Sequence, residues 1–318
     1  MVSTTTSSSI QRQTNAIHLT PSLSRLERFA GQIASLESIP GLDAILQPLL
    51  SYLQQPFEKQ DMQRIVDLIS HDNALTAQCL HMANSPLLGH WQPITTPRAA
   101  VAALGLQRMR DIVLSCCMLR LLSEDSDRHE LIALWEHSLA CALISRKLAR
   151  RVGVPDPEQA YIAGLLHDLG LMVNLHLAPG DFRERLRRAR AECCSLHVLE
   201  HEAWGCTHCD TGAMLAARWE LAPLVIDVVQ QHHQPPGNAP HRATIALITI
   251  GDQLCRANGL GYGWVENLRI DWEQNELLEL LKEEWPVARN LNWPAVGAEL
   301  ASYLKEVRKL VAVMFRFQ

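Results

Sequence analysis

Histidine and aspartate residues recur inside apolar stretches in the second half of this chain. His167 and Asp168 lie in the middle of the segment AGLLHDLGLMV, which otherwise has the composition of a buried helix. A charged carboxylate is rarely buried unless it is paired or bound to a metal. Imidazole and carboxylate groups together are ligands of zinc, iron, manganese and similar ions. The two residues therefore indicate either a metal site or a buried ion pair.

Five further residues of these two types share this setting: His137, His208, His232, His233 and Asp252. A single one of them would ordinarily be a hydrogen-bonded core residue, but the set favours metal ligation because unpaired polar groups are costly in apolar helices. We expect a first metal position formed by His137, His167, Asp168 and Asp252. We expect a second position beside it, completed by His208, His232 and His233. Asp168 has two oxygens and could bridge two ions; the alternative is a metal-free site in which the imidazoles pair with Asp168.

The segments that carry these residues are predicted to be helices. Aromatic residues make up only 5% of the chain and alternating strand patterns are hard to find, whereas apolar residues recur at helical spacing. In KQDMQRIVDLISHD, for example, Met62, Ile65, Val66 and Ile69 share one face. The polar segment SEDSDRHE separates two helical halves. The sequence therefore predicts an all-α fold, a helical bundle module of two lobes.

The composition limits the classes of function. The 318 residues include 29 Lys and Arg against 34 Asp and Glu, a net charge of −5, which gives no general attraction to nucleic acid or anionic membranes. No apolar run is long enough to span a bilayer, and the Ser/Thr-rich N-terminus lacks the apolar core of a secretory signal. We therefore expect a cytoplasmic protein without direct nucleic-acid or membrane binding. The nine scattered cysteines argue against a disulfide framework, and Cys206-x-x-Cys209 has no second C-x-x-C to complete a zinc site.

The order of these residues resembles the HD superfamily of metal-dependent phosphohydrolases, in which His … His-Asp … Asp binds the first metal. The added His208, His232 and His233 are similar to the two-metal arrangement of the HD-GYP branch. The chain resembles the HDOD (HD-related output domain) family more closely still. The motifs that carry this resemblance appear in order as ISHDNALTAQCLHMANSPLLG, PRAAVAALGLQRMRDIVL, AYIAGLLHDLGLMV and HCDTGAMLAARWELAPLVIDVVQQHH, and it covers about residues 20 to 260.

The resemblance implies an all-helical bacterial module of signalling and regulation, often without demonstrated catalysis. Two departures from the active HD-GYP pattern favour regulation over turnover: Leu171 stands where that branch has Lys, and QPPGNAP stands in place of its Gly-Tyr-Pro loop. We therefore expect a signal-transduction module that holds one or two divalent ions and has a protein or a nucleotide second messenger as its partner. The alternative is a metal-dependent phosphohydrolase acting on a nucleotide or phosphodiester, with Asp168 as the candidate catalytic residue.

The predicted organisation has four parts. They are a disordered tail over residues 1–20, an N-terminal helical lobe over 21–125, an HD-like helical lobe over 126–262 and a C-terminal helical extension over 263–318. The extension carries two apolar stripes, one formed by Leu277, Leu280 and Leu281 and the other by Leu304, Val307, Leu310 and Val311. Because such stripes need a partner surface, we expect the extension to pack on the module or on a second subunit.

Overall fold

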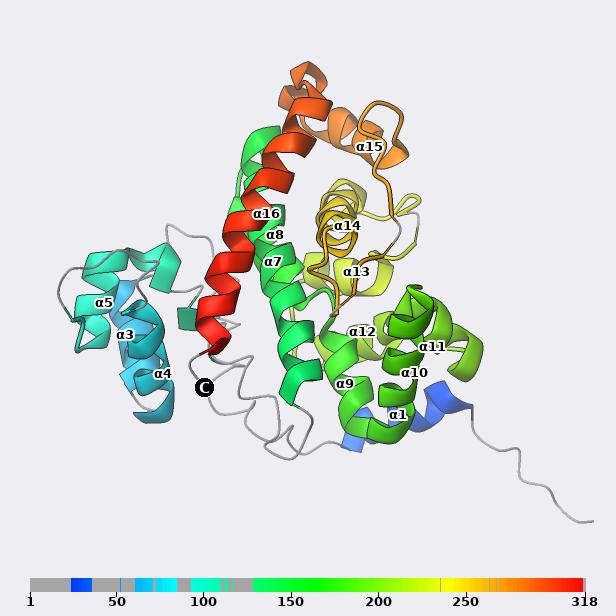
Figure 1. The fold of residues 1–318 in the computed structure, drawn as a ribbon, viewed down its shortest axis with the longest axis horizontal. Helices are drawn as coiled ribbons and strands as arrows, with labels where there is room; N and C mark the ends of the chain where they lie inside the picture. Colours follow the sequence, from blue (N-terminus) through cyan, green and yellow to red (C-terminus); the bar gives the residue numbers. More distant parts are fainter. Residues whose placement is uncertain are drawn as a thin grey trace, which may run out of the picture.

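The structure is a computed structural model, which describes residues 24–35, 52, 61–70, 73–84, 93–109, 112–113, 116, 128–234, 236–262, 264–266 and 268–316. Over these residues it contains fourteen α-helices, one 3-10 helix and a single isolated bridge between Gly261 and Trp264. The predicted all-α fold is confirmed (Figure 1). The predicted disordered tail lies outside the described residues.

Three helices of the N-terminal half contact one another: α3 (Met62–Ser70), α4 (Asn73–Ala83) and α5 (Pro97–Leu104). The predicted apolar face of α3 is buried at Ile65, Val66 and Ile69. Helix α5 begins where Thr96 accepts a hydrogen bond from the backbone of Ala99, and it has Pro97 in its first turn, a position that suits proline because its missing N–H has no helical partner there.

Eight helices of the second half surround the histidine-rich region: α7 (Arg128–Val152), α8 (Pro157–Leu166), α9 (Leu169–Leu177), α10 (Pro179–Glu192), α11 (Leu196–Trp204), α12 (His208–Arg218), α13 (Pro223–Gln231) and α14 (Arg242–Ala257). The long helix α7 packs against both α8 and α14, and α9 packs against α12. Trp135 and Tyr161 are among the largest fully buried side chains. This half therefore supplies a rigid apolar frame for the polar residues inside it.

Helix α1 (Arg25–Ser35) packs on the second half of the chain, against α12. The ring of Phe29 meets that of Trp204 edge to face with centroids 5.8 Å apart, and Arg25 forms a 2.7 Å ion pair with Asp181. Figure 1 shows α1 beside α10 and α12, apart from α3, α4 and α5. The sequence-based division had grouped α1 with those three helices, and the proposed limits of the four parts stay predictions.

The C-terminal extension packs on the module, as predicted. Its elements are α15 (Glu276–Glu284), a 3-10 helix (Pro286–Asn290) and α16 (Trp293–Arg316). Helix α15 contacts α14, and α16 runs along α7 (Figure 1). The buried residues of α15 are Leu278 and Leu281, while Leu277 and Leu280 are partly exposed, so the stripe is rotated from the predicted one. In α16, Leu304 and Val307 are buried as expected, and the side chains of Leu310 and Val311 are outside the described part of the structure.

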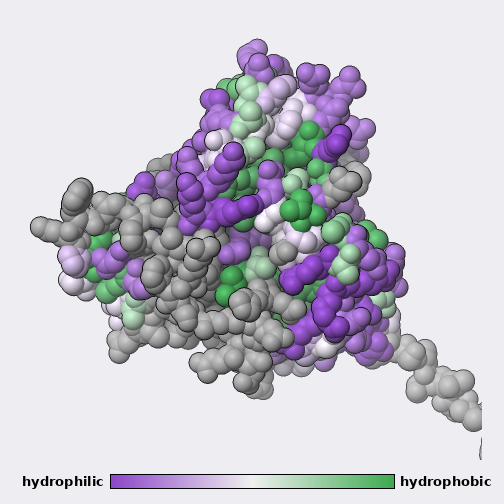
Figure 2. Space-filling model, in the orientation of Figure 1, coloured by the Kyte–Doolittle hydropathy of each residue, from purple (hydrophilic) through white to green (hydrophobic). Residues whose placement is uncertain are grey.

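Hydrophilic side chains cover most of the described surface on the face shown in Figure 2, with hydrophobic ones in small separate groups. Among the described residues, no helix combines the length and the apolar character that crossing a bilayer requires.

Candidate metal centre

Six helices, through their ends or their interiors, bring the predicted site residues to one place. His137 lies within α7, His167 follows the last residue of α8, and Asp168 precedes α9. His208 begins α12, where Thr207 and Asp210 form a reciprocal capping box. His232 follows α13, and Asp252 lies within α14. All six of these site side chains are buried.

A close crossing of α9 and α12 brings Asp168 to His208. A Cβ added at Gly170 would overlap the backbone carbonyl of His208, and one added at Gly212 would lie 2.8 Å from the backbone nitrogen of Gly170. Only residues without a Cβ allow two helix backbones to approach this closely. Gly170, the glycine of the segment HDLG, therefore allows the helix crossing that brings Asp168 to His208.

The carboxylate of Asp168 is the common neighbour of four imidazoles. Its Oδ2 lies 3.4 Å from Nε2 of His137 and 3.3 Å from Nε2 of His167. Its Oδ1 lies 3.3 Å from Nε2 of His208 and 3.3 Å from Nε2 of His232. Two imidazoles therefore face each oxygen, which is the arrangement that a bridging carboxylate requires.

The second nitrogen, Nδ1, of each of these four rings is held by the protein. The acceptors are the carbonyls of Leu260 for His137 (2.7 Å), Gly164 for His167 (2.7 Å), and Val228 and Val229 for His232 (3.1 Å each), and the carboxylate of Glu200 for His208 (2.6 Å). A ring that donates its Nδ1 hydrogen and is neutral has a lone pair on Nε2. Such anchoring is typical of metal-binding histidines.

The inward-facing atoms fit a cation. Asp168 Oδ1, His208 Nε2 and His232 Nε2 are buried without a hydrogen-bond partner, which is costly unless a proton or an ion lies between them. Two sets of ligand atoms each fall within 4.8 Å of one another: Asp168, His208, His232 and His233 in one, and His137, His167 and Asp168 in the other. A divalent ion in each set would satisfy all of these lone pairs.

Asp252 differs from the other predicted ligands. It lies 3.1 Å from Nε2 of His137 and 4.0 Å from Nε2 of His167, but it is outside both ligand sets. Its two oxygens accept hydrogen bonds from Nε of Arg256 at 2.9 and 3.0 Å, and Oδ2 also accepts one from Nη2 at 2.8 Å. Burial alone would raise the pKa of Asp252, but Arg256 and His137 hold it well below its usual range. Asp252 thus already has a cationic partner.

Tyr262 contacts the carboxylate of Asp168 from a loop after α14. Its hydroxyl donates a 2.5 Å hydrogen bond to Oδ2 of Asp168, and its ring centroid lies 4.6 Å from that of His137. Its backbone has a positive φ of 28°, a conformation that is uncommon for a bulky residue. Burial and the charge of Asp168 raise the pKa of Tyr262, so the hydroxyl keeps its hydrogen.

Sequence reasoning missed several residues that shape the site. Arg256 was detectable, because it follows Asp252 by four residues and therefore shares its helix face. Glu200 and Tyr262 carried no signal in their spacing. Glu200 is itself fixed by a 2.9 Å hydrogen bond from Asn174, whose amide oxygen accepts a 2.8 Å bond from Thr211.

His233 and His197 are only partly buried. Their ring centroids lie 4.7 Å apart, and the ring of His233 lies 5.1 Å from that of His208. Burial and the proximity of His208 lower the pKa of His197 to about 4, which makes this ring neutral at physiological pH. The sequence pointed to His233 but not to His197.

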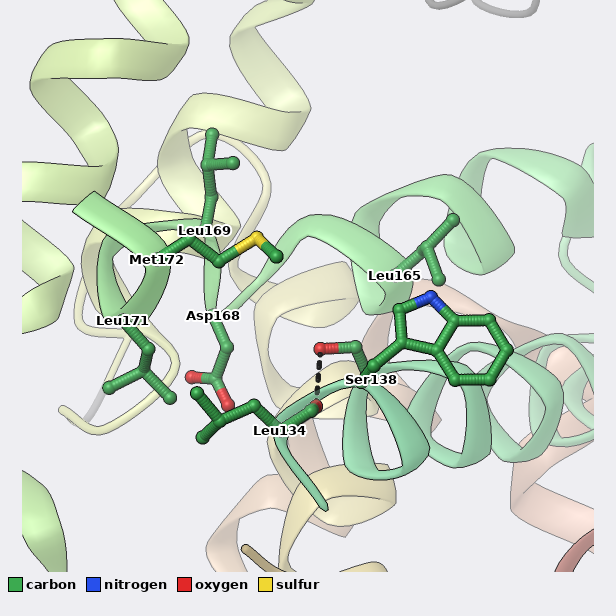
Figure 3. A pocket seen from close by; sticks show the side chains of 8 residues that line it. Leu134, Ser138, Leu165, Asp168, Leu169, Leu171 and Met172 are labelled. Atoms are coloured by element: carbon green, nitrogen blue, oxygen red, sulfur yellow. Dashed lines mark hydrogen bonds between the residues drawn. The ribbon is translucent and has the colours of Figure 1, made fainter. Parts of the chain in front are cut away.

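A small, mostly apolar pocket borders Asp168 (Figure 3). Its walls include Leu134 and Trp135 of α7 together with Leu165, Leu169, Leu171 and Met172. The hydroxyl of Ser138, also in the wall, bonds to the carbonyl of Leu134 at 3.2 Å. Leu171 is buried. The described wall of this pocket therefore offers an incoming ligand apolar groups and no cation.

Cys206 and Cys209 point into different surroundings. Cys206 belongs to the apolar cluster around Phe29 and Trp204, and burial raises its pKa to about 11. The sulfur of Cys209 lies 4.0 Å from Nδ1 of His232. Neither cysteine belongs to a set of possible metal ligands in the described part of the chain.

This fold and this site together define a class of protein: all-helical, with a buried cluster of histidines around an aspartate. Within that class the chain belongs to the HDOD family, whose HDOD domain matches residues 39–235. An uncharacterized protein of Treponema pallidum (strain Nichols) is 31% identical over 232 residues, which are 70% of this chain and 43% of that protein. The chain thus spans less than half the length of this curated relative.

Solved structures share the fold. An HDOD domain protein of unknown function from Geobacter sulfurreducens is 27% identical, with a TM-score of 0.73 over 92% of this chain and 98% of that chain. A Shewanella amazonensis SB2B protein, provisionally named a phosphohydrolase, is 21% identical, with a TM-score of 0.64 over 90% and 97% of the two chains. A Marinobacter aquaeolei VT8 protein, provisionally named a signal transduction protein, is 21% identical, with a TM-score of 0.68 over 91% of this chain and 65% of that chain.

Proposed function

We propose that this chain is a bacterial signal-transduction module whose state depends on one or two divalent ions bound around Asp168. One observation carries the proposal: Oδ1 of Asp168 and Nε2 of His208 and His232 are buried together without a partner. Buried lone pairs that face one another need a positive charge between them. A stoichiometric metal ion would supply it.

The two ligand sets would give two metal positions that share Asp168. His137 and His167 would complete the first, and His208, His232 and His233 would complete the second. These side chains come from α7, α8, α12 and α13 and their ends. An ion that binds only the folded state would therefore stabilise the contacts among these helices, which links metal supply to the rigidity of the module.

Regulation is favoured over phosphoester turnover by the immediate surroundings of Asp168. Leu171 stands where the HD-GYP branch has a lysine, and the described wall of the pocket around it has no cation to hold a phosphate. The hydroxyl of Tyr262 already occupies Oδ2 of Asp168. Arg256 neutralises Asp252. We propose a protein or a nucleotide second messenger as the partner that responds to the metal-bound state.

A metal-dependent phosphohydrolase is the second candidate function. It is favoured by the partial exposure of His197 and His233, which gives the second position a side that faces solvent. Bound divalent ions would lower the pKa of a water molecule and stabilise charge on phosphoryl oxygens. On this reading Asp168 would hold both ions, and the substrate would be a nucleotide or a phosphodiester.

The deciding experiment measures metal content and hydrolysis on the same sample. The full chain is purified without chelator, supplied separately with manganese, iron or zinc, and assayed by inductively coupled plasma mass spectrometry. The metal-loaded protein is then screened against phosphodiesters and nucleotides. Stoichiometric metal without hydrolysis supports the signalling module, and metal with hydrolysis supports the second candidate. Absence of stoichiometric metal under all three supplies contradicts both.

A further inference from the structure

Six histidines surround the site, and they fall into two groups by how their rings are held. His137, His167, His208 and His232 are buried, and each has one nitrogen bonded to a carbonyl or carboxylate. His197 and His233 are partly exposed, and their nitrogens make no hydrogen bond within the described part of the chain. The rings of the four buried histidines are therefore fixed in position, whereas those of His197 and His233 have nitrogens available to a ligand.

Helix α11 connects the two groups. Glu200 is buried and anchors His208 through a 2.6 Å bond to Nδ1. His197 precedes Glu200 by three residues, so the two side chains share one face of the helix. The ring centroid of His197 lies 4.7 Å from that of His233 and 6.1 Å from that of His208. His197 is therefore a partly exposed neighbour of two residues in the second ligand set.

We propose that His197, beside the metal-ligand candidate His233, forms a binding site for an anionic group, phosphoryl or carboxylate, at the second metal position. His197 would donate a hydrogen bond to an oxygen of the group, and a bound ion would attract the group's negative charge. The inference deepens the proposed function and rests on it, because the anion needs the ion as its second partner. It adds a ligand class and a residue, His197, that lies outside the ligand sets.

An anion suits this entrance better than the alternatives. Oxygen anions bind divalent ions and also accept hydrogen bonds from imidazole N–H groups. A cationic ligand would be repelled by the ion. A purely apolar ligand would leave the nitrogens of His197 without a hydrogen-bond partner, and it would instead suit the apolar pocket lined by Leu171.

The test uses inorganic phosphate as the probe and the full manganese-loaded chain as the protein. Phosphate affinity is measured by isothermal titration calorimetry, and proximity to the ion by the paramagnetic relaxation of the ³¹P signal. The variants are His197→Ala and His197→Gln, which keeps an N–H donor. His201→Ala is the matched control, because His201 lies on the same helix one turn away and is exposed. Circular dichroism and metal content are recorded for each.

We expect His197→Ala to retain its metal and to bind phosphate about tenfold more weakly, the loss of one hydrogen bond to a charged group. His197→Gln should recover part of the affinity, and His201→Ala should match the unaltered chain. Equal phosphate affinity in His197→Ala, or loss of metal from a folded His197→Gln, overturns this inference while leaving the metal-dependent module intact. If the unaltered chain binds no manganese, the proposed function and this inference both fail.

Discussion

The Nε2 atoms of His137 and His167 lie 3.2 Å apart in the interior of the protein, and the Nδ1 atom of each ring bonds to a backbone carbonyl. If both rings were neutral, two lone pairs would face each other at hydrogen-bond distance. Something positive must therefore lie between or beside them: a proton on one ring, or a metal ion. Burial alone would lower the pKa of His167, but Asp168 holds it well above its ordinary value, so the metal-free site keeps a proton there.

Asp168→Asn should abolish metal binding at both positions. The substitution keeps the size of the side chain and removes the charge that both ligand sets share. We expect less than stoichiometric metal by mass spectrometry and no rise in melting temperature when manganese is added, whereas the unaltered chain should melt at a higher temperature with the ion. Asp227→Asn, at an ion pair with His241 outside the site, is the control and should retain its metal. A metal-loaded Asp168→Asn protein would contradict the proposed centre.

Stability should depend on pH with opposite signs in the metal-free and metal-loaded protein. Burial alone would lower the pKa values of His208 and His167, but Glu200 holds that of His208, and Asp168 that of His167, well above 6.5. The proton on a raised group stabilises the fold fully below pH 6.5, and this contribution is lost as pH rises through the raised pKa. Metal ions require unprotonated imidazoles, so their stabilisation grows over the same range.

Melting temperatures between pH 6.5 and pH 9, with chelator and with saturating manganese, measure these slopes. We expect the metal-free melting temperature to fall with pH and the increment due to manganese to grow. Parallel curves in the two conditions would show that the imidazoles around Asp168 do not exchange protons for metal.

Gly170→Ala should destabilise the protein strongly and separate Asp168 from His208. The added Cβ would overlap the His208 carbonyl at the crossing of α9 and α12, and relieving such an overlap costs about 3 kcal/mol or more. Gly180→Ala is the control, because no atom lies within 4 Å of its added Cβ and the residue lies in the first turn of α10. Urea unfolding should show a large decrease in the free energy of unfolding for Gly170→Ala and little change for Gly180→Ala. A Gly170→Ala protein of ordinary stability would refute the close crossing.

Tyr262→Phe should weaken the metal-free protein and strengthen metal binding. Its hydroxyl satisfies Oδ2 of Asp168 at 2.5 Å, and leaving a buried acceptor unpaired costs about 1–3 kcal/mol. The same hydroxyl competes with an ion for that oxygen. Urea unfolding with chelator and metal competition with a chromophoric chelator measure the two effects. Weaker metal binding in Tyr262→Phe would instead identify the hydroxyl as a support for the ion.

The residues that converge at the site could be predicted from the sequence because they are polar residues within apolar helical segments. His137, His167, Asp168, His208 and His232 stand in segments with apolar helical patterns, and the structure brings all five together. That they bind metal stays a prediction. Glu200 and Tyr262 lie in separate segments whose approach depends on tertiary packing, so no local spacing could reveal them.

For the fold, too, local patterns were predictable and tertiary packing was not. Helices are local, and their periodicity was sufficient to predict an all-α architecture. The docking of α1 was not predictable in this way, because an amphipathic helix can bury its apolar face against any complementary surface. Its contacts with Trp204 and Asp181 join residues about 150 or more positions apart in the chain. Similarly, the buried stripe of α15 differs from the predicted one because α14 decides which leucines are covered.

The family match ends at residue 235, two positions after His233. Yet the side chains that orient His137 and occupy Asp168 come later, from Asp252, Arg256 and Tyr262, and Glu266 holds Arg256 in turn at 2.5 Å. The segment that matches the family is therefore shorter than the segment that is needed to form the complete site. Any chimera that borrows this centre has to carry α14 and the loop to Glu266 with it.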